Sequence, residues 1–237
     1  GFDLNAACSG FLFAYNTAQA YIASGIYRTI LIIGSESLSR IVDWTDRGTC
    51  ILFGDGAGAV LLQAKEGKSY QPVSHSDGRG GPALTGPGVL GRARSIDQDP
   101  KETKTEYITM NGKDVFQFAV RKVPQVIQEV LGRNELFLED IDWFVLHQAN
   151  ARIVDSVARR LRLDIEKFPM NLQEYGNTSS ASFKLLWSIT GWQSGTDISC
   201  VSRSPPAQYF IYDSATLSLI RSTCLLYTSP SPRDTER

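Results

Sequence analysis

Residues 3–11 read DLNAACSGF, and this stretch decides the fold because a short extended run turns there into a long helical pattern. Apolar side chains recur at helical spacing from Gly10 to Ser24, which predicts a helix. Cys8 therefore lies at the helix N-terminus, where unpaired N–H groups and the helix dipole favour a thiolate. The position predicts a nucleophile, and a buried structural cysteine is the alternative.

A histidine is expected at the end of a later buried strand. Residues 142–147, DWFVLH, read as that strand, and a helix is predicted over residues 150–161. The sequence has one other histidine, His75, which lies in a polar, turn-rich stretch that no strand positions. His147 is therefore the predicted base, with a hydrogen-bonded core histidine as the alternative.

An amide follows in the loop YGNTSSAS, residues 175–182, which is rich in small residues and carries Asn177 near its start. Cys8, His147 and Asn177 are far apart in the sequence, and each lies at the end of an element. This arrangement matches the pattern of a nucleophile, a base and an orienting group. The trio predicts covalent catalysis by the cysteine.

Six short motifs occur in one order along the chain: AACSG at 6–10, TDRGT at 45–49, FGDGAGA at 53–59, MNGKDVF at 110–116, HQAN at 147–150 and GNTS at 176–179. Together they resemble 3-oxoacyl-(acyl-carrier-protein) synthase III, the initiating condensing enzyme of type II fatty acid synthesis, over residues 1–182. The segment 44–62 is most similar to cyanobacterial and plastid members. The resemblance implies an α/β thiolase-like fold, with two βαβαβ halves in α/β/α/β/α layers, and a homodimer.

The same resemblance implies a division of the chain: 1–65 ends the first half, 66–106 is a surface excursion, 107–182 belongs to the second half, and 183–237 is a tail outside the family. A reading frame shifted by one base lets the codons of residues 183–188 encode a family-like helix, and residues 224–234 resemble translated cloning-adapter sequence. We therefore expect a frameshift near Ser182, with a divergent C-terminus as the alternative. We also expect the first half to lack its opening portion and the chain as written to be inactive.

Strands alternate with helices along the chain, which predicts an α/β class with a mixed or parallel sheet. The expected elements are strands over 1–7, 29–35 and 59–62 and helices over 10–24 and 115–131. Pro124 predicts a kink or a local break in the last helix. The motif GDGAGA at 54–59 is similar to a dinucleotide fingerprint, but that fingerprint must open a helix. Because a strand is expected to follow, we interpret the glycines as a tight turn.

The chemistry implied by the resemblance starts with transfer of an acyl group, expected to be acetyl, from acyl-CoA to Cys8. Malonyl-(acyl carrier protein) then loses carbon dioxide, and His147 and Asn177 stabilise the enolate; no metal or redox cofactor is implied. The implied binding residues are Arg47 with Trp44 at the adenine-nucleotide end of coenzyme A, Asn150 in the pantetheine tunnel, Phe116 near the active site or in the core, and Arg152 on a basic face for the acidic carrier protein.

The composition agrees with a soluble enzyme, because 42% of residues are apolar and 21% are charged. The net charge of −1 does not indicate binding to nucleic acid or to an anionic membrane. The four cysteines lack the spacing of a disulfide or zinc framework. The implied location is the bacterial cytoplasm or the plastid stroma, and because Gly1 is not an initiator methionine, a lost targeting segment stays open. Two other function classes stay open. One is a related condensing enzyme of the same fold, namely a polyketide or long-chain ketoacyl synthase or an acyltransferase; a His–His pair in place of His–Asn would mark the elongating synthases. The other is an inert fragment.

Overall fold

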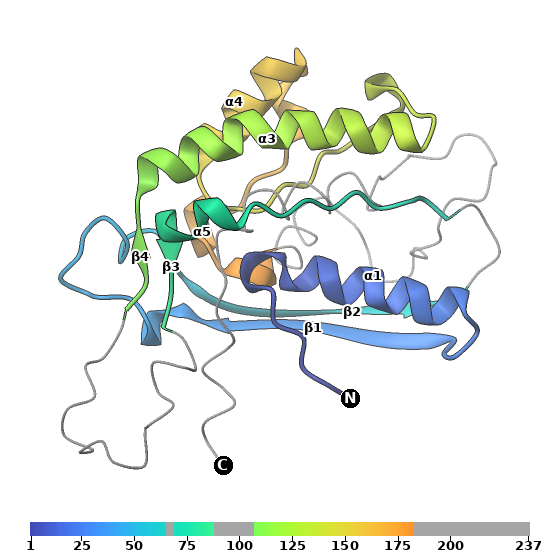
Figure 1. The fold of residues 1–237 in the computed structure, drawn as a ribbon, viewed down its shortest axis with the longest axis horizontal. Helices are drawn as coiled ribbons and strands as arrows, with labels where there is room; N and C mark the ends of the chain where they lie inside the picture. Colours follow the sequence, from blue (N-terminus) through green and yellow to red (C-terminus); the bar gives the residue numbers. More distant parts are fainter. Residues whose placement is uncertain (65–68, 88–106, 183–237) are drawn as a thin grey trace.

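The computed structural model describes residues 1–64, 69–87 and 107–182, so the tail at 183–237 and its expected frameshift lie outside the described residues. The helices and strands are α1 (Gly10–Ala23), β1 (Thr29–Ser37), β2 (Asp55–Gln63), β3 (Leu84–Thr85), β4 (Thr109–Met110), α3 (Gly112–Arg133), α4 (Ala151–Leu161) and α5 (Leu172–Tyr175). Short 3-10 helices are η1 (Ala7–Ser9), η2 (Leu38–Arg40), η3 (Gly78–Ala83), η5 (Leu138–Asp140), η6 (Ile165–Lys167) and η7 (Ser179–Ala181). In Figure 1, α1 lies along the β1–β2 pair, and α3 and α4 lie together on the opposite side of the molecule.

The β1–β2 pair is an antiparallel ribbon whose register runs from Thr29 opposite Gln63 to Ser37 opposite Asp55. Side chains alternate across the ribbon, and those on one face pack against α1. The buried members of this cluster include Ile32, Val60 and Leu62 of the ribbon and Phe11, Leu12, Tyr15 and Ala18 of α1. On the other face, Leu31, Ile33 and Leu61 are 57%, 64% and 53% exposed. The strand over residues 29–35, whose apolar sequence predicts a buried strand, is therefore buried on one face only within the described part of the chain.

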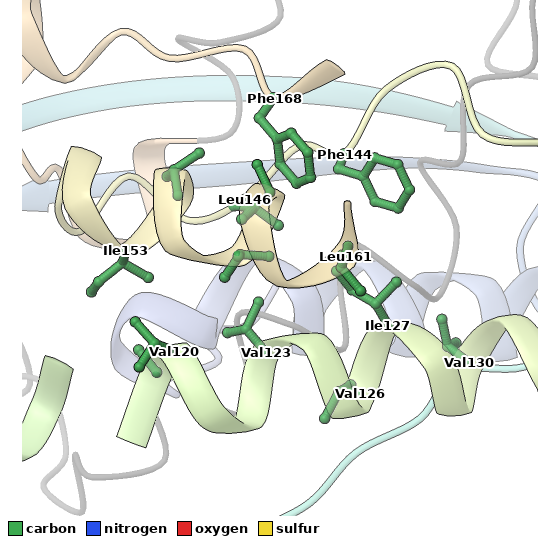
Figure 2. Close-up of a cluster of buried hydrophobic side chains, with 14 of the residues drawn as sticks. Val120, Val123, Val126, Ile127, Val130, Phe144, Leu146, Ile153, Leu161 and Phe168 are labelled. Carbon is green, nitrogen blue, oxygen red and sulfur yellow. The ribbon is translucent and has the colours of Figure 1, made fainter. Parts of the chain in front are cut away.

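A second core lies between α3 and α4 (Figure 2). The helix expected over residues 115–131 is confirmed as part of α3, and its apolar residues share one face: Ala119, Val120, Val123, Ile127 and Val130 are buried, and Phe116 is partly buried. They pack with Ile153, Val154, Val157 and Leu161 of α4 and with Phe144 and Phe168, whose rings stack with their centroids 5.1 Å apart. Burial of each such side chain contributes about 1.5–3 kcal/mol, so this core supports the segment that carries His147.

Pro124 does not break α3, which runs continuously from Gly112 to Arg133. Proline removes one backbone hydrogen bond within a helix and crowds the preceding turn. Pro124 is itself buried on the apolar face of α3. Packing of that face offsets the lost hydrogen bond, so the predicted local break is wrong.

Two predicted strands are absent from the described residues. Residues 1–6 are irregular, and so are residues 142–147, although Phe144 and His147 are buried. A strand forms only where its backbone pairs with a neighbour, and within the described ranges neither segment pairs with a strand. The N–H of Phe144 instead donates to the carbonyl of Lys167 at 2.8 Å. Of the described pairings, β1–β2 and β3–β4 are antiparallel, and the bridge between Phe53 and Asn177 is parallel.

Residues 55–59 of the glycine-rich segment lie in β2, which begins at Asp55, so the predicted tight turn is wrong there; Gly54 immediately precedes the strand. The strand expected at 59–62 is confirmed as part of β2. Glycine weakens a strand interior but permits another backbone to approach closely. Gly34 and Gly58 face each other across the ribbon, and a Cβ at Gly34 would lie 3.0 Å from the carbonyl oxygen of Ser180. The glycines therefore leave room for η7.

The expected surface excursion is partly packed. Val73 is 1% exposed and belongs to the α3–α4 core. The Asn134 side chain accepts a hydrogen bond from the N–H of Gln71 at 2.7 Å and donates to its carbonyl at 3.0 Å. Residues 69–87 are thus attached to the end of α3 and do not only follow the surface. Within the described ranges, every helix is too short or too polar to cross a bilayer.

Candidate active site

Cys8 occupies the 3-10 turn η1, which leads directly into α1, so the prediction of a thiol at a helix N-terminus is confirmed. Its side chain is buried, with 8% of the residue exposed. The preceding residue, Ala7, has a φ of 49°. A non-glycine residue in this region costs about 1–3 kcal/mol and persists only where its surroundings hold it. The backbone is therefore strained immediately before the thiol.

His147 ends the buried segment 142–147 and is 6% exposed. Its Nδ1 is buried and has no hydrogen-bond partner among the described residues. Three residues later, the side chain of Asn150 accepts a hydrogen bond from the N–H of Arg152 at 2.9 Å and so caps the N-terminus of α4. His75, in contrast, is exposed and bonds Glu129 at 2.6 Å on the surface. Of the two histidines, His147 is the buried one.

Asn177 is held at its backbone and at its side chain. Its N–H donates to the carbonyl of Leu52 at 2.8 Å, and its carbonyl accepts from the N–H of Gly54 at 2.9 Å. Its Oδ1 accepts from the N–H of Ser179 at 2.9 Å. Since an N–H can bond only to the oxygen of the amide, this contact fixes which way the amide points. Ser179 has a φ of 50°, a second strained position beside a predicted catalytic residue.

These three predicted catalytic residues line one pocket of about 450 Å³. Its lining also includes three of the predicted binding residues, namely Phe116, Asn150 and Arg152. The guanidinium of Arg152 lies 5.6 Å from the centroid of the Phe116 ring, a cation–π contact. The remaining walls are mostly apolar, from Leu52, Phe53, Leu84, Met110, Val115 and Ile153. Lys113 also lines the pocket, so its largely apolar wall carries a thiol, an imidazole, two amides, a guanidinium and an ammonium group.

Trp44 and Arg47 are exposed and are absent from the described lining of this pocket. They lie on the loop between η2 and β2, and Gly48 of the same loop does line the pocket. The carboxylate of Asp43 accepts from the N–H and hydroxyl of Thr45 at 2.8 and 2.7 Å, and these bonds hold the pKa of Asp43 below its usual value. The loop is thus ordered by its own acidic side chains at the edge of the pocket.

A second cavity of about 530 Å³ lies among the N-terminal residues, α1 and β1. Cys8 lines it too, but neither His147 nor Asn177 does so in the described part of the chain. Because a lone cysteine there has no second polar group of the trio beside it, the smaller pocket is the candidate active site. Among the described residues, no three acidic, histidine or cysteine side chains gather as a metal ion would require.

The sequence did not indicate the supporting role of four residues. Gly54 lies against Tyr175, and Glu36 accepts hydrogen bonds from the hydroxyls of Ser179 and Ser180 across the fold. The contacts of Glu36 join residues 143 and 144 positions apart. Contacts of that length leave no local pattern. The run of small residues in YGNTSSAS was the one available signal, because small side chains permit close packing.

The arrangement has the parts of an acyl-transfer site. A buried thiol at a helix N-terminus is favoured as thiolate and can attack a carbonyl. An imidazole and an amide in the same pocket can donate hydrogen bonds to an oxygen on which negative charge develops. Together they can form a covalent acyl intermediate and stabilise an oxyanion or enolate.

Two family models match the chain: 3-oxoacyl-(acyl-carrier-protein) synthase III over residues 2–78, and the C-terminal part of the same synthase over residues 131–189. The second match passes residue 182, where the resemblance was expected to end. Beta-ketoacyl-(acyl-carrier-protein) synthase III of Microcystis aeruginosa is 50% identical over 188 residues, which are 78% of this chain and 56% of that protein.

Solved structures give the same result. A beta-ketoacyl-(acyl carrier protein) synthase III from Thermus thermophilus is 38% identical with a TM-score of 0.67, over 80% of this chain and 58% of that one. The priming beta-ketosynthase from the R1128 polyketide pathway is 35% identical with a TM-score of 0.70, over 80% of this chain and 56% of that one. The predicted α/β thiolase-like fold is confirmed by these neighbours. The chain spans a little more than half the length of the curated relatives it matches.

Proposed function

The chain belongs to the 3-oxoacyl-(acyl-carrier-protein) synthase III family, and we propose that its pocket carries out the initiating condensation of fatty acid synthesis. The observation that carries the proposal is that Cys8, His147 and Asn177 line one buried pocket although they come from three distant segments. The proposed reaction joins an acyl group, expected to be acetyl, to malonyl-(acyl carrier protein) with loss of carbon dioxide. The proposed location remains the bacterial cytoplasm or the plastid stroma.

In the first half-reaction, the thiolate of Cys8 attacks the thioester carbonyl of acyl-CoA. The tetrahedral intermediate collapses, the carbon–sulfur bond to coenzyme A breaks, and coenzyme A leaves with a proton from solvent. The dipole of α1 stabilises the thiolate before attack. The product of this half-reaction is acyl-Cys8.

In the second half-reaction, malonyl-(acyl carrier protein) enters and its terminal carbon–carbon bond breaks. Carbon dioxide leaves, and the electron pair forms an enolate with its charge on the thioester oxygen. His147 and Asn177 donate hydrogen bonds to that oxygen, each worth about 2.7–4 kcal/mol of barrier. The enolate carbon then attacks acyl-Cys8, the thiolate leaves, and 3-oxoacyl-(acyl carrier protein) is released. No metal or redox cofactor takes part.

The binding residues divide by position. Asn150 and Phe116 line the pocket and suit the pantetheine arm shared by coenzyme A and the carrier protein. Trp44 and Arg47 on the adjoining exposed loop suit the adenine-nucleotide end, since a planar guanidinium both stacks and binds phosphate. Arg152 is proposed to receive the acidic carrier protein. A homodimer is proposed from the family alone.

A second candidate function is priming of a polyketide chain, favoured by the likeness to the R1128 priming ketosynthase. The two functions share the chemistry and differ in the carrier protein and primer. Assaying condensation with carrier proteins of both pathways, across primers of increasing length, separates them. Preference for the fatty acid carrier protein with acetyl-CoA supports the first function.

The test of the proposed function is covalent labelling. Two proteins are incubated with radiolabelled acetyl-CoA: the 237-residue chain, and a chimera in which residues 1–182 replace the matching part of the Microcystis aeruginosa relative. In the chimera we expect label on the peptide that contains Cys8, and its loss in Cys8→Ala. The 237-residue chain, which we expect to be inactive as written, should remain unlabelled. Cys50→Ala is the matched control, because Cys50 is a free cysteine outside the described lining of the pocket. Labelling that survives Cys8→Ala would refute the assignment.

A further inference from the structure

Glu36, at the end of β1, reaches across the fold to the loop that carries Asn177. Its Oε1 accepts a hydrogen bond from the hydroxyl of Ser180 at 2.6 Å and another from the hydroxyl of Ser179 at 3.3 Å. Hydrogen bonds to a carboxylate are roughly twice as strong as those between neutral groups. One carboxylate thus holds two consecutive residues of η7.

Ser179 connects this carboxylate to the amide of Asn177. Its hydroxyl bonds Glu36, and its backbone N–H donates to Oδ1 of Asn177 at 2.9 Å. Because Oδ1 is occupied by that N–H, the amino group of the Asn177 amide points in a different direction and is available to donate. The orientation of a proposed enolate donor therefore depends on where Ser179 is held.

The backbone around Ser179 needs such a restraint. Its φ of 50° is one that side-chain-bearing residues adopt at a cost. The loop is also confined by packing: a Cβ at Gly34 would lie 3.0 Å from the carbonyl oxygen of Ser180, and one at Gly10 would lie 3.5 Å from its Cβ. The turn η7 therefore packs between β1 and the start of α1 at Gly10, which follows Cys8 by two residues.

We propose that Glu36 is a positioning residue: through Ser179 it fixes the amide of Asn177 for the decarboxylation step, an inference that rests on the proposed function. It touches neither substrate nor reacting atoms. Its loss should lower release of carbon dioxide from malonyl-(acyl carrier protein), while acylation of Cys8, which uses the thiolate and the helix dipole, is retained. Misplacement of a catalytic group by about 1 Å can cost about 100-fold in rate, so we expect a loss of about 10- to 100-fold.

The kinetic test uses Glu36→Ala and Glu36→Gln in the chimera. Glu36→Gln keeps an oxygen that can accept the serine hydroxyls, so we expect it to recover most of the rate. Glu129→Gln is the matched control, since Glu129 lies on the exposed side of α3 and bonds His75 there. The decisive comparison adds Asn177→Ala: if Glu36 acts through Asn177, Glu36→Ala should cause little further loss in that background. An equal loss in both backgrounds would overturn the proposal.

A second measurement needs no turnover. Hydrogen–deuterium exchange of the 237-residue chain should be faster in peptides covering residues 176–182 for Glu36→Ala, and unchanged there for Glu129→Gln. Unchanged exchange for Glu36→Ala would show that Glu36 does not hold η7 and would overturn the proposal, whatever the kinetics. If the unsubstituted proteins neither label Cys8 nor release carbon dioxide, the proposed function fails instead, and the exchange result alone decides whether Glu36 holds the loop.

Discussion

Replacing Gly54 by alanine tests whether the close approach of the backbone just before β2 to Tyr175 positions Asn177. Gly54 does not need glycine for its φ, which lies outside the left-handed region. It needs glycine for space: an added Cβ would lie 2.2 Å from the carbonyl oxygen of Tyr175, whereas ordinary contact begins near 3.4 Å. The two backbones must therefore separate by about 1.2 Å, the difference between these distances.

That separation acts on the two hydrogen bonds that hold the backbone of Asn177, to Leu52 at 2.8 Å and from Gly54 at 2.9 Å. Each such bond contributes about 0.5–1.5 kcal/mol, and forcing an extra methyl group into a packed region costs about 1–3 kcal/mol. We expect Gly54→Ala to lower the free energy of unfolding by about 2–6 kcal/mol, the sum of the two lost bonds and the overpacking. A shift of Asn177 by about 1 Å should also lower decarboxylation about 100-fold.

Urea unfolding and carbon dioxide release from malonyl-(acyl carrier protein) measure the two effects in the chimera. Gly132→Ala is the matched control: Gly132 lies in α3, and an added Cβ there meets nothing within 4 Å. Alanine at a helical position is favoured over glycine by about 1 kcal/mol, so the control should be slightly more stable and fully active. If Gly54→Ala unfolds and turns over like the unsubstituted protein, the close approach to Tyr175 does not position Asn177.

Two further predictions concern the pair His147 and Asn177, and Asp55 at the start of β2. His147→Ala and Asn177→Ala should still acquire label from acetyl-CoA but release carbon dioxide about 100- to 1000-fold more slowly, and unimpaired release in both would contradict the enolate assignment. Burial raises the pKa of Asp55, but hydrogen bonds from the hydroxyl and N–H of Ser39 lower it by more than burial raises it. The pKa of Asp55 therefore lies below the usual 3.8. The stabilisation is therefore present above pH 3.8 and lost as the pH falls through the lowered value. As the pH falls from 3.8 through the lowered pKa, the difference in unfolding free energy between Asp55→Asn and the unsubstituted protein should narrow. A difference that stays constant with pH would refute the stabilising role of the Asp55 carboxylate.

Local pattern was sufficient to place the predicted catalytic residues. The helical spacing after Cys8, the apolar run before His147 and the small residues around Asn177 each drew attention to one residue, although the strand expected before His147 is absent from the described residues. Such signals depend only on neighbouring residues. The structure adds that the three residues line one pocket, which periodicity alone cannot state because it carries no distance between segments.

Pairing and close approach were the parts that the sequence could not supply. Residues 142–147 have the composition of a strand, yet no strand pairs with them in the described part of the chain. The glycines at 54–59 permit both a turn and a strand, and the choice depends on β1 beside them and on Tyr175 against Gly54. Both errors arise because the deciding partner lies far away in the sequence.

The site combines two kinds of support that have different mechanical consequences. His147 follows a segment buried in the α3–α4 core, so its position depends on apolar packing spread over many side chains. Cys8 and Asn177 instead lie beside the strained residues Ala7 and Ser179, and the turns that carry them, η1 and η7, pack against each other. Their positions depend on a few short contacts that single substitutions can release. Substitutions in the α3–α4 core should therefore reduce stability before chemistry, whereas substitution of Glu36 should affect chemistry most and Gly54→Ala should affect both.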